Sequence, residues 1–193
     1  LAAQKANSVD KVIISTDSPE IKETVLSFNF SKLEVFNRSQ KNATDRSSTE
    51  SAMLEYIKSN NLPLDLKFIL AQATSPFLTS FNIDSAIEEL NNSNKDSLLS
   101  CSIMKRFLWT ADGASLNYDR YNRPRRQDFS GILVENGAIY INSIRNILKR
   151  NNRLSDNVHV YVMPEYAITE IDEPDDWVYA EYLMKTHILS KEP

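Results

Sequence analysis

The sequence has little glycine. Its 193 residues include only three, Gly113, Gly131 and Gly137, where average usage of roughly 7% would give about 13. The phosphate loops of P-loop proteins, dinucleotide-binding folds and kinases need two or three clustered glycines, so none of those motifs is present. A protein of this composition that binds phosphate does so without a glycine-rich loop, or its phosphate loop lies outside these residues.

Cysteine and histidine are also scarce. The single Cys101 cannot form an internal disulfide, and its apolar neighbours favour a buried, inert thiol over a reactive one. The two histidines, His159 and His187, are too few to form a zinc site with one cysteine. We therefore expect neither a disulfide framework nor a zinc centre.

Long apolar runs and an excess of positive charge are absent as well. No apolar run reaches the roughly 18 residues of a membrane span, so we expect none. The formal net charge of −4 argues against a nucleic-acid-binding surface, which is usually basic. Residues 1–5 lack a signal-peptide pattern and are typical of the middle of a helix, so we expect the N-terminus to be truncated.

Short apolar segments alternate with helix-like segments along the chain. We expect strands at 11–15, 33–36, 68–71, 98–104, 135–142, 159–164 and 167–172, and helices at 19–28, 48–59, 80–90, 143–151 and from Pro174. This alternation predicts a three-layer α/β fold with a mostly parallel sheet. Residues 107–131 break the pattern with a polar, arginine-rich stretch, which we interpret as an arm inserted into a single domain.

Polar side chains cluster at the expected strand ends, where ligands bind in open α/β sheets. The clusters are Thr16-Asp17-Ser18, Arg38 with Ser47-Ser48-Thr49, Gln72 with Thr74-Ser75, and Glu170 with Asp172. The amide and hydroxyls at 72–75 suit a polyol or a carboxylate ligand. They suit an ordinary helix cap at least as well.

Two charged groups each have a functional and a structural interpretation. Glu170 and Asp172 lie two apart, so on a strand both carboxylates point to one face and suit Mg²⁺ bound to substrate phosphates. The alternative is an acidic helix start. Arg123, Arg125 and Arg126 suit an anionic ligand through their planar donors, and the alternative is a solvated charge run.

Several segments together resemble the CMP-N-acylneuraminate synthetases, the cytidylyltransferases that activate sialic acids. The matching segments are VIISTDSPEI (12–21), VFNRSQKNATDRSSTES (35–51), LAQATSPF (70–77), RPRRQDFSGILVENGAIYI (123–141) and EIDEPDDWVYAE (170–181). They follow the family order over nearly the whole chain.

The resemblance implies a Rossmann-like nucleotidyltransferase fold and an Mg²⁺-dependent reaction. The anomeric hydroxyl of a nine-carbon keto-acid sugar attacks the α-phosphate of CTP, CMP-sialic acid forms and pyrophosphate leaves. The resemblance also implies a homodimer or a dimer of dimers. Residues 107–131 would then be the dimerisation arm of one cytidylyltransferase domain over 1–193.

The resemblance assigns roles to individual residues. It implies catalytic roles for Asp172 and Arg125 and metal binding by Asp172 and Glu170. Arg125 and Gln127 match the arm that reaches a neighbouring subunit's site. The residues that it implies to bind substrate are Arg38, Ser48 and Thr49 for the nucleotide, and Gln72, Thr74, Ser75, Gln127, Asn136 and Tyr140 for the sugar.

One family motif is missing from this sequence. The family begins with a strand and an Arg-Gly-Gly-Ser-Lys-Gly loop that wraps the triphosphate. Three interpretations therefore stay open: a sialic acid-activating synthetase without that segment, a non-catalytic relative that dimerises or binds the sugar, and a cytidylyltransferase for a related nonulosonic acid. The compartment also stays open, cytoplasmic for a bacterial protein and nuclear or Golgi for an animal one.

Overall fold

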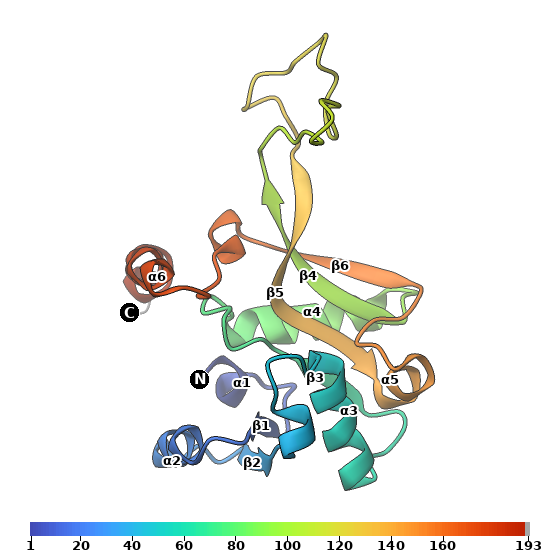
Figure 1. Cartoon of the computed structure of the whole chain (residues 1–193), viewed down its shortest axis with the longest axis vertical. Coiled ribbons are helices and arrows are strands. Elements are labelled where there is room, and N and C mark those ends of the chain that lie inside the picture. Colours follow the sequence, from blue (N-terminus) through green and yellow to red (C-terminus); the bar gives the residue numbers. More distant parts are fainter. Residues whose placement is uncertain (192–193) are drawn as a thin grey trace. The chain divides into compact units, whose positions relative to one another are not determined.

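The computed structural model describes residues 1–191 and has an α/β fold with two sheets (Figure 1). In the first sheet, β1 (Val12–Thr16) pairs in parallel with β2 (Leu33–Asn37), with Val12 opposite Leu33. The second sheet has the strand order β3-β5-β4-β6. Its strands are β3 (Lys67–Leu70), β4 (Ser97–Met104), β5 (Ile132–Ser143) and β6 (Val158–Met163).

The predicted α/β fold is confirmed, but its strand pairing is mixed, being parallel between β1 and β2 and antiparallel between β3 and β5. Strands β3 and β5 are antiparallel, with Lys67 opposite Ser143 and Leu70 opposite Tyr140. Parallel neighbours need a crossover connection, usually a helix, that returns the chain to the same end of the sheet. The connection from β4 into β5 is the segment 105–131, which has no helix, so the alternation of strands and helices fails at this point.

The helices lie where the sequence predicts them. They are α1 (Ala2–Lys5), α2 (Pro19–Ser27), α3 (Thr49–Asn60), α4 (Ser80–Asn92), α5 (Ile144–Arg150) and α6 (Pro174–His187). Their starts follow from local chemistry, because hydroxyl side chains accept hydrogen bonds from free backbone N–H groups. Ser18 accepts from Ile21, Ser48 from Ser51, and Thr79 forms a reciprocal capping box with Asn82.

The strand expected over 167–172 does not form. Glu165–Ile168 is a 3-10 helix, η2, and 169–172 is irregular backbone. Two tight turns replace the strand, because the N–H of Ala167 donates to Pro164 O at 2.9 Å and that of Thr169 to Tyr166 O at 3.2 Å. Glu170 and Asp172 therefore do not lie on one face of a strand, and the prediction from period-two alternation is wrong.

Asparagine takes three of the positions where this glycine-poor chain has a positive φ. Asn61 and Asn151 end α3 and α5 with φ of 46° and 49°, and Asn29 follows α2 with φ of 51°. Asparagine is the residue that tolerates this conformation best after glycine. Three turns that would ordinarily contain glycine therefore need none.

The residues divide into two compact units. Unit 1 comprises 1–72, 78–99 and 139–161, and unit 2 comprises 73–77, 100–138 and the described residues from Val162 onward. Strands β4, β5 and β6 contribute residues to both units. The prediction of a single domain over 1–193 stays a prediction.

Each unit has its own apolar core. In unit 1, Met53 and Ile57 of α3 pack with Ile144 and Ile147 of α5. In unit 2, the buried apolar side chains include Phe77, Cys101, Phe129, Met163, Ala167, Ala180 and Leu183. Cys101 is buried, as predicted. Burial raises the pKa of its thiol, and the nearby Glu135 raises it further, which disfavours the reactive thiolate.

The arm at 105–131 is an irregular loop at the ends of β4 and β5 (Figure 1). It packs on its own aromatic side chains, with the Phe107 ring 4.5 Å from that of Tyr118 and 4.9 Å from that of Phe129. Gly131 closes its base with φ of +86°, and a Cβ there would lie 2.7 Å from Ile103 Cγ2. Among residues 1–191, no helix is long and apolar enough to cross a membrane.

One ion pair links the two helices of the unit 1 core. Arg153, which follows α5, donates to the Glu50 carboxylate at the start of α3 through Nε (2.6 Å) and Nη2 (3.1 Å). Its guanidinium also lies 4.8 Å from the centre of the Tyr140 ring. The hydrogen bonds from Arg153 lower the pKa of Glu50. The two-pronged geometry makes this pair stronger than an ordinary surface ion pair.

We predict that Glu50→Gln lowers the free energy of unfolding by about 1–2 kcal/mol at neutral pH. A lowered pKa stabilises the fold above the ordinary glutamate pKa, and this stabilisation is lost as the pH falls through the folded-state pKa. The difference in the free energy of unfolding between the variant and the unsubstituted protein should therefore shrink in acid. Urea unfolding at a series of pH values measures it. Glu23→Gln, on the exposed face of α2, is the control. Equal effects of both substitutions would contradict the account.

Candidate functional site

In unit 1, Arg38 is fixed where β1 and β2 end. Its Nε donates to Ser15 Oγ at 3.3 Å, and its Nη2 donates to the Ser15 carbonyl. Its own backbone N–H donates to Thr16 O at 3.0 Å. The guanidinium is thus held at the carboxyl ends of two parallel strands, which is where α/β folds bind ligands.

The segment after Arg38 is attached to α3. Glu55 accepts from the backbone N–H of Ser39 at 3.1 Å and from the Asn42 amide at 2.9 Å. Sequence reasoning missed Glu55, because no pattern links a mid-helix acid to a loop one element earlier. Ser48 and Thr49, both predicted to hold the nucleotide, form the start of α3. The Ser48 hydroxyl is engaged there as the helix cap, with Ser51 N at 3.1 Å.

The two remaining predicted sugar residues of unit 1 differ in accessibility. Gln72 comes shortly after β3 and is half-buried, so part of the residue is exposed. Tyr140 is only 3% exposed and its ring lies under the Arg153 guanidinium. In this structure Tyr140 belongs to the core, and only Gln72 is placed to meet a ligand.

In unit 2 the hydroxyl motif and the acidic motif lie side by side. The backbone N–H of Ile171, between Glu170 and Asp172, donates to Thr74 O at 2.9 Å. Ser75 is nearly buried, and its hydroxyl donates to the Asn136 carbonyl at 3.1 Å and also interacts with the Glu170 carboxylate. The structure thus brings together two motifs that are about a hundred residues apart in the sequence.

Negative charge accumulates around Glu170. Burial raises the pKa of its carboxyl, and the charges of Asp172 and Glu135 raise it further, while the Ser75 hydroxyl lowers it. Glu135 is a member of this group that the sequence did not reveal, because it precedes Asn136 in a strand far from the acidic motif. Like charges held this close repel each other and favour a bound cation.

Asn136 is completely buried, and its amide is used inside unit 2. Its Oδ1 accepts from Ser100 Oγ at 2.6 Å, and its Nδ2 donates to Ser102 Oγ at 3.2 Å. A buried amide with partners on both atoms has little capacity left for a ligand. The sugar-contacting role implied by the resemblance stays a prediction, and in this structure Asn136 holds Ser75 through its carbonyl.

The arm residues predicted to reach a neighbouring subunit are exposed. Arg125 donates to Asp128 at 2.6 Å, and Arg126 lies 3.8 Å from Glu165. The Arg123 guanidinium covers the Phe107 ring at 4.2 Å, so this arginine supports the arm. Gln127 lies in the same exposed turn. The charge run is therefore partly neutralised by its own acidic neighbours.

The acidic group offers the kind of oxygen ligands that a divalent cation such as Mg²⁺ prefers. Mg²⁺ is usually held by one or two carboxylates, with water and substrate phosphates completing its shell. Glu170 and Asp172 supply such a pair, and their mutual repulsion is what a cation would relieve. Within residues 1–191, no group of three or more acidic, histidine or cysteine side chains has the geometry of a complete metal cage.

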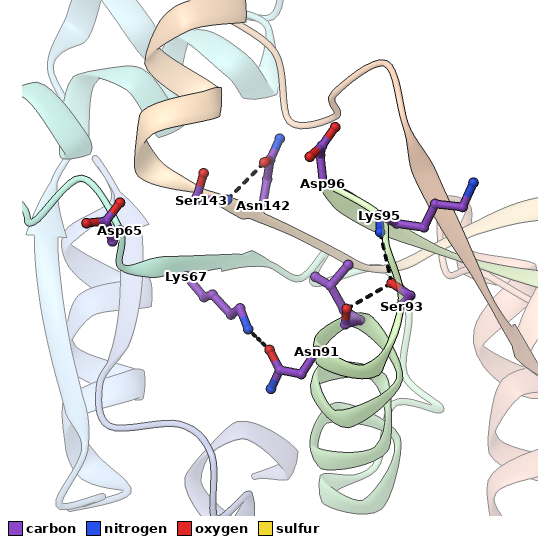
Figure 2. A pocket seen from close by; sticks show the side chains of 9 residues that line it. Asp65, Lys67, Asn91, Ser93, Lys95, Asp96, Asn142 and Ser143 are labelled. Carbon is purple, nitrogen blue, oxygen red and sulfur yellow. Dashed lines mark hydrogen bonds between the residues drawn. The ribbon is translucent and has the colours of Figure 1, made fainter.

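A separate polar pocket of about 250 Å³ lies in unit 1 at the start of β3 (Figure 2). Three of its charged side chains are engaged, since Lys67 donates to Asn91, Lys95 donates to Asn157 and Asp65 accepts from Arg145. In Figure 2 the Lys95 chain points away from the other labelled residues. The pocket is at the opposite end of β3 from Gln72, so it is not the site that the strand ends predict.

The known protein family that matches this chain is described as "Cytidylyltransferase", over residues 1–190. The chain belongs to this family. An N-acylneuraminate cytidylyltransferase of Oncorhynchus mykiss is 32% identical over 187 residues, which cover 93% of this chain and 42% of that protein. The N-acylneuraminate cytidylyltransferase of Streptococcus agalactiae serotype III is 25% identical over 192 residues, which cover 92% of this chain and 44% of that protein. The cytidylyltransferase chain thus spans less than half the length of these relatives.

Solved structures establish the fold of this cytidylyltransferase chain. A CMP:2-keto-3-deoxy-manno-octonic acid synthetase complexed with CTP has 15% identity and a TM-score of 0.63, covering 97% of this chain and 86% of its own. A 4-diphosphocytidyl-2C-methyl-D-erythritol synthase has 10% identity and a TM-score of 0.68, and the match covers 95% of this chain and 86% of that one. These confirm the predicted nucleotidyltransferase fold.

We predict that Glu170→Gln stabilises the protein at neutral pH. A raised pKa means that ionising Glu170 costs stability, and this cost is complete above the folded-state pKa and absent below the ordinary glutamate pKa. The variant should therefore unfold at higher urea than the unsubstituted protein near pH 7.5, and the gain should vanish near pH 4. Glu165→Gln, exposed in the same segment, is the control. A gain that persists in acid would contradict this origin.

Proposed function

We propose that the protein transfers CMP from CTP to the anomeric hydroxyl of a sialic acid, releasing pyrophosphate. The observation that carries the proposal is the direct packing of the Thr74-Ser75 motif on the Glu170-Asp172 motif through the Ile171–Thr74 hydrogen bond. Curated relatives that cover most of this chain are named N-acylneuraminate cytidylyltransferases, which supports the same substrate. The hydroxyls would face the sugar while the adjacent carboxylates would face phosphate-bound metal.

The chemistry of the acidic group supports phosphoryl transfer. Glu170 and Asp172 would hold Mg²⁺, which when bound neutralises phosphate charge and orients the displacement. Asp172 is exposed and is the better direct ligand, while Glu170 is half-buried beside Ser75. The Ser75 hydroxyl has one proton to donate, so its bonds to the Asn136 carbonyl and to Glu170 compete. This competition couples the position of Ser75 to the charge on Glu170.

Other residues would bind the nucleotide and reach the partner subunit. Arg38 would bind the CTP base or ribose, because its guanidinium is fixed at the ends of β1 and β2. We also propose a homodimer or a dimer of dimers in which Arg125 and Gln127 of the exposed arm reach the neighbouring subunit's site. There the guanidinium would meet the sugar carboxylate, an anion that it matches with two parallel hydrogen bonds.

The test is a turnover assay with a protein that contains residues 1–193, CTP, Mg²⁺ and N-acetylneuraminate. We expect CMP-N-acetylneuraminate and one pyrophosphate per product molecule. A panel of other nine-carbon keto-acid sugars in the same assay compares sialic acid with related nonulosonic acids. CTP binding without product from any sugar would overturn the proposed transfer and favour a non-catalytic relative.

We predict that Asp172→Asn abolishes most Mg²⁺-dependent turnover while leaving the fold nearly intact. Replacing a metal-binding carboxylate in an electrostatically driven transfer is expected to lower kcat by about a hundredfold or more. Urea unfolding should show little change, because Asp172 is exposed. Asp175→Asn, at the second residue of α6 and likewise exposed, is the control. Unchanged turnover of Asp172→Asn at limiting Mg²⁺ would rule out the ligand role.

We predict that Arg38 and Gln72 affect different substrates. Arg38→Ala should raise the KM for CTP, and Gln72→Ala should raise the KM for the sugar, each by about tenfold, the size of one lost polar contact. The measurement is steady-state kinetics with each substrate varied in turn. Both substitutions raising the same KM would show that the assignment of these residues is wrong.

A further inference from the structure

A buried hydrogen-bond path connects the interior of unit 2 to the acidic motif. Ser102 of β4 is completely buried, and its hydroxyl donates to the Pro164 carbonyl at 3.0 Å. The same hydroxyl accepts from the Asn136 amide at 3.2 Å. A serine hydroxyl has one proton to donate and can also accept, so both of these bonds form at once.

Pro164 is the point from which the acidic motif is built. Its carbonyl also accepts from Ala167 N at 2.9 Å, which is the first turn of η2, and η2 leads directly to Thr169 and Glu170. The Tyr166 ring on η2 packs against Phe77 at 5.6 Å and stacks on His187 at 4.4 Å. The start and the body of η2 therefore both have fixed partners inside unit 2.

Beyond η2 the acidic motif has two other attachments. Ile171 N bonds to Thr74 O in its middle, and at its end the N–H groups of Asp172 and Glu173 donate to the Asp176 carboxylate at 3.1 Å and 2.8 Å. Those attachments fix Asp172 on both sides. Glu170 lies between the Ile171 attachment and η2, so its backbone direction depends on where η2 begins.

We propose that Ser102 is a positioning residue whose hydroxyl fixes the start of η2 and so sets the direction of Glu170, and with it how tightly Glu170 and the separately fixed Asp172 hold a divalent cation. The proposal rests on the proposed function only in taking these carboxylates as the metal site. Groups that orient metal ligands without touching the metal commonly change metal affinity by a large factor. Ser102 does so from inside the protein, where neither the sugar nor CTP reaches it.

Ser100 offers a matched control on the same strand. It is also a buried β4 serine, 1% exposed, and it bonds to the same Asn136 side chain, through Oδ1 at 2.6 Å. The Ser100 hydroxyl donates its one proton to Asn136, whereas the Ser102 hydroxyl donates its proton to the Pro164 carbonyl. If the loss of any buried hydrogen bond weakened cation binding, both serine variants would bind the cation less tightly. A positioning effect would weaken cation binding in the Ser102 variant alone.

The experiment measures Mn²⁺ binding by electron paramagnetic resonance, with CTP present, in the unsubstituted protein, Ser102→Ala and Ser100→Ala. We expect the Kd for Mn²⁺ to rise about tenfold in Ser102→Ala and to stay unchanged in Ser100→Ala. The Mg²⁺ concentration for half-maximal turnover should shift in parallel, with the KM for the sugar unchanged. If Ser102→Ala fails to fold, Ser102→Cys, which fills the site with a somewhat larger side chain but donates only weakly, takes its place.

The outcomes separate the two claims. Equal Mn²⁺ affinities in Ser102→Ala and the unsubstituted protein, or equal losses in both serine variants, would overturn the positioning role. No Mn²⁺ binding by the unsubstituted protein with CTP would overturn the metal site of the proposed function itself.

Discussion

The backbone hydrogen bond from Ile171 to Thr74 is the contact on which the candidate site of unit 2 depends. It joins a hydroxyl motif to an acidic motif that lies far along the chain, and it leaves a carboxylate on either side. Because the bond uses backbone atoms, it involves none of the side chains of Thr74, Glu170 and Asp172. The fold thus supplies the geometry, and the side chains supply the chemistry.

Repulsion between carboxylates has a cost that the rest of unit 2 offsets. The pKa of Glu170 is raised by burial and by its acidic neighbours, so ionising it opposes folding. The opposing contributions are the Ser102–Pro164 bond, the ring contacts of Tyr166 and the cap at Asp176. Unit 1 shows the reverse arrangement, because Glu50 is paired with Arg153 and its charge stabilises the fold. Glu50 stabilises the fold, whereas Glu170 is held at a cost in stability where its charge would bind a metal.

Much of the fold could be predicted from the sequence, because caps and apolar runs act locally. Ser18, Ser48 and Pro174 mark helix starts where the structure has them. The antiparallel pairing of β3 with β5 could not be predicted, because strand order depends on long-range contacts. The strand expected over 167–172 failed because Pro164 and Tyr166 close turns there. In the site, Glu170 and Asp172 were visible as a motif, whereas Glu135 and Ser102 become neighbours of that motif only through folding.

The most direct test of the account is to locate a divalent cation in the protein. A crystal of a protein containing residues 1–193, soaked with CTP and Mn²⁺, would show the metal by its anomalous scattering. The account predicts a peak in contact with the Asp172 carboxylate, beside Glu170, with triphosphate oxygens in the same coordination shell. A nucleotide-bound metal held by other residues, with Asp172 and Glu170 facing solvent, would contradict it.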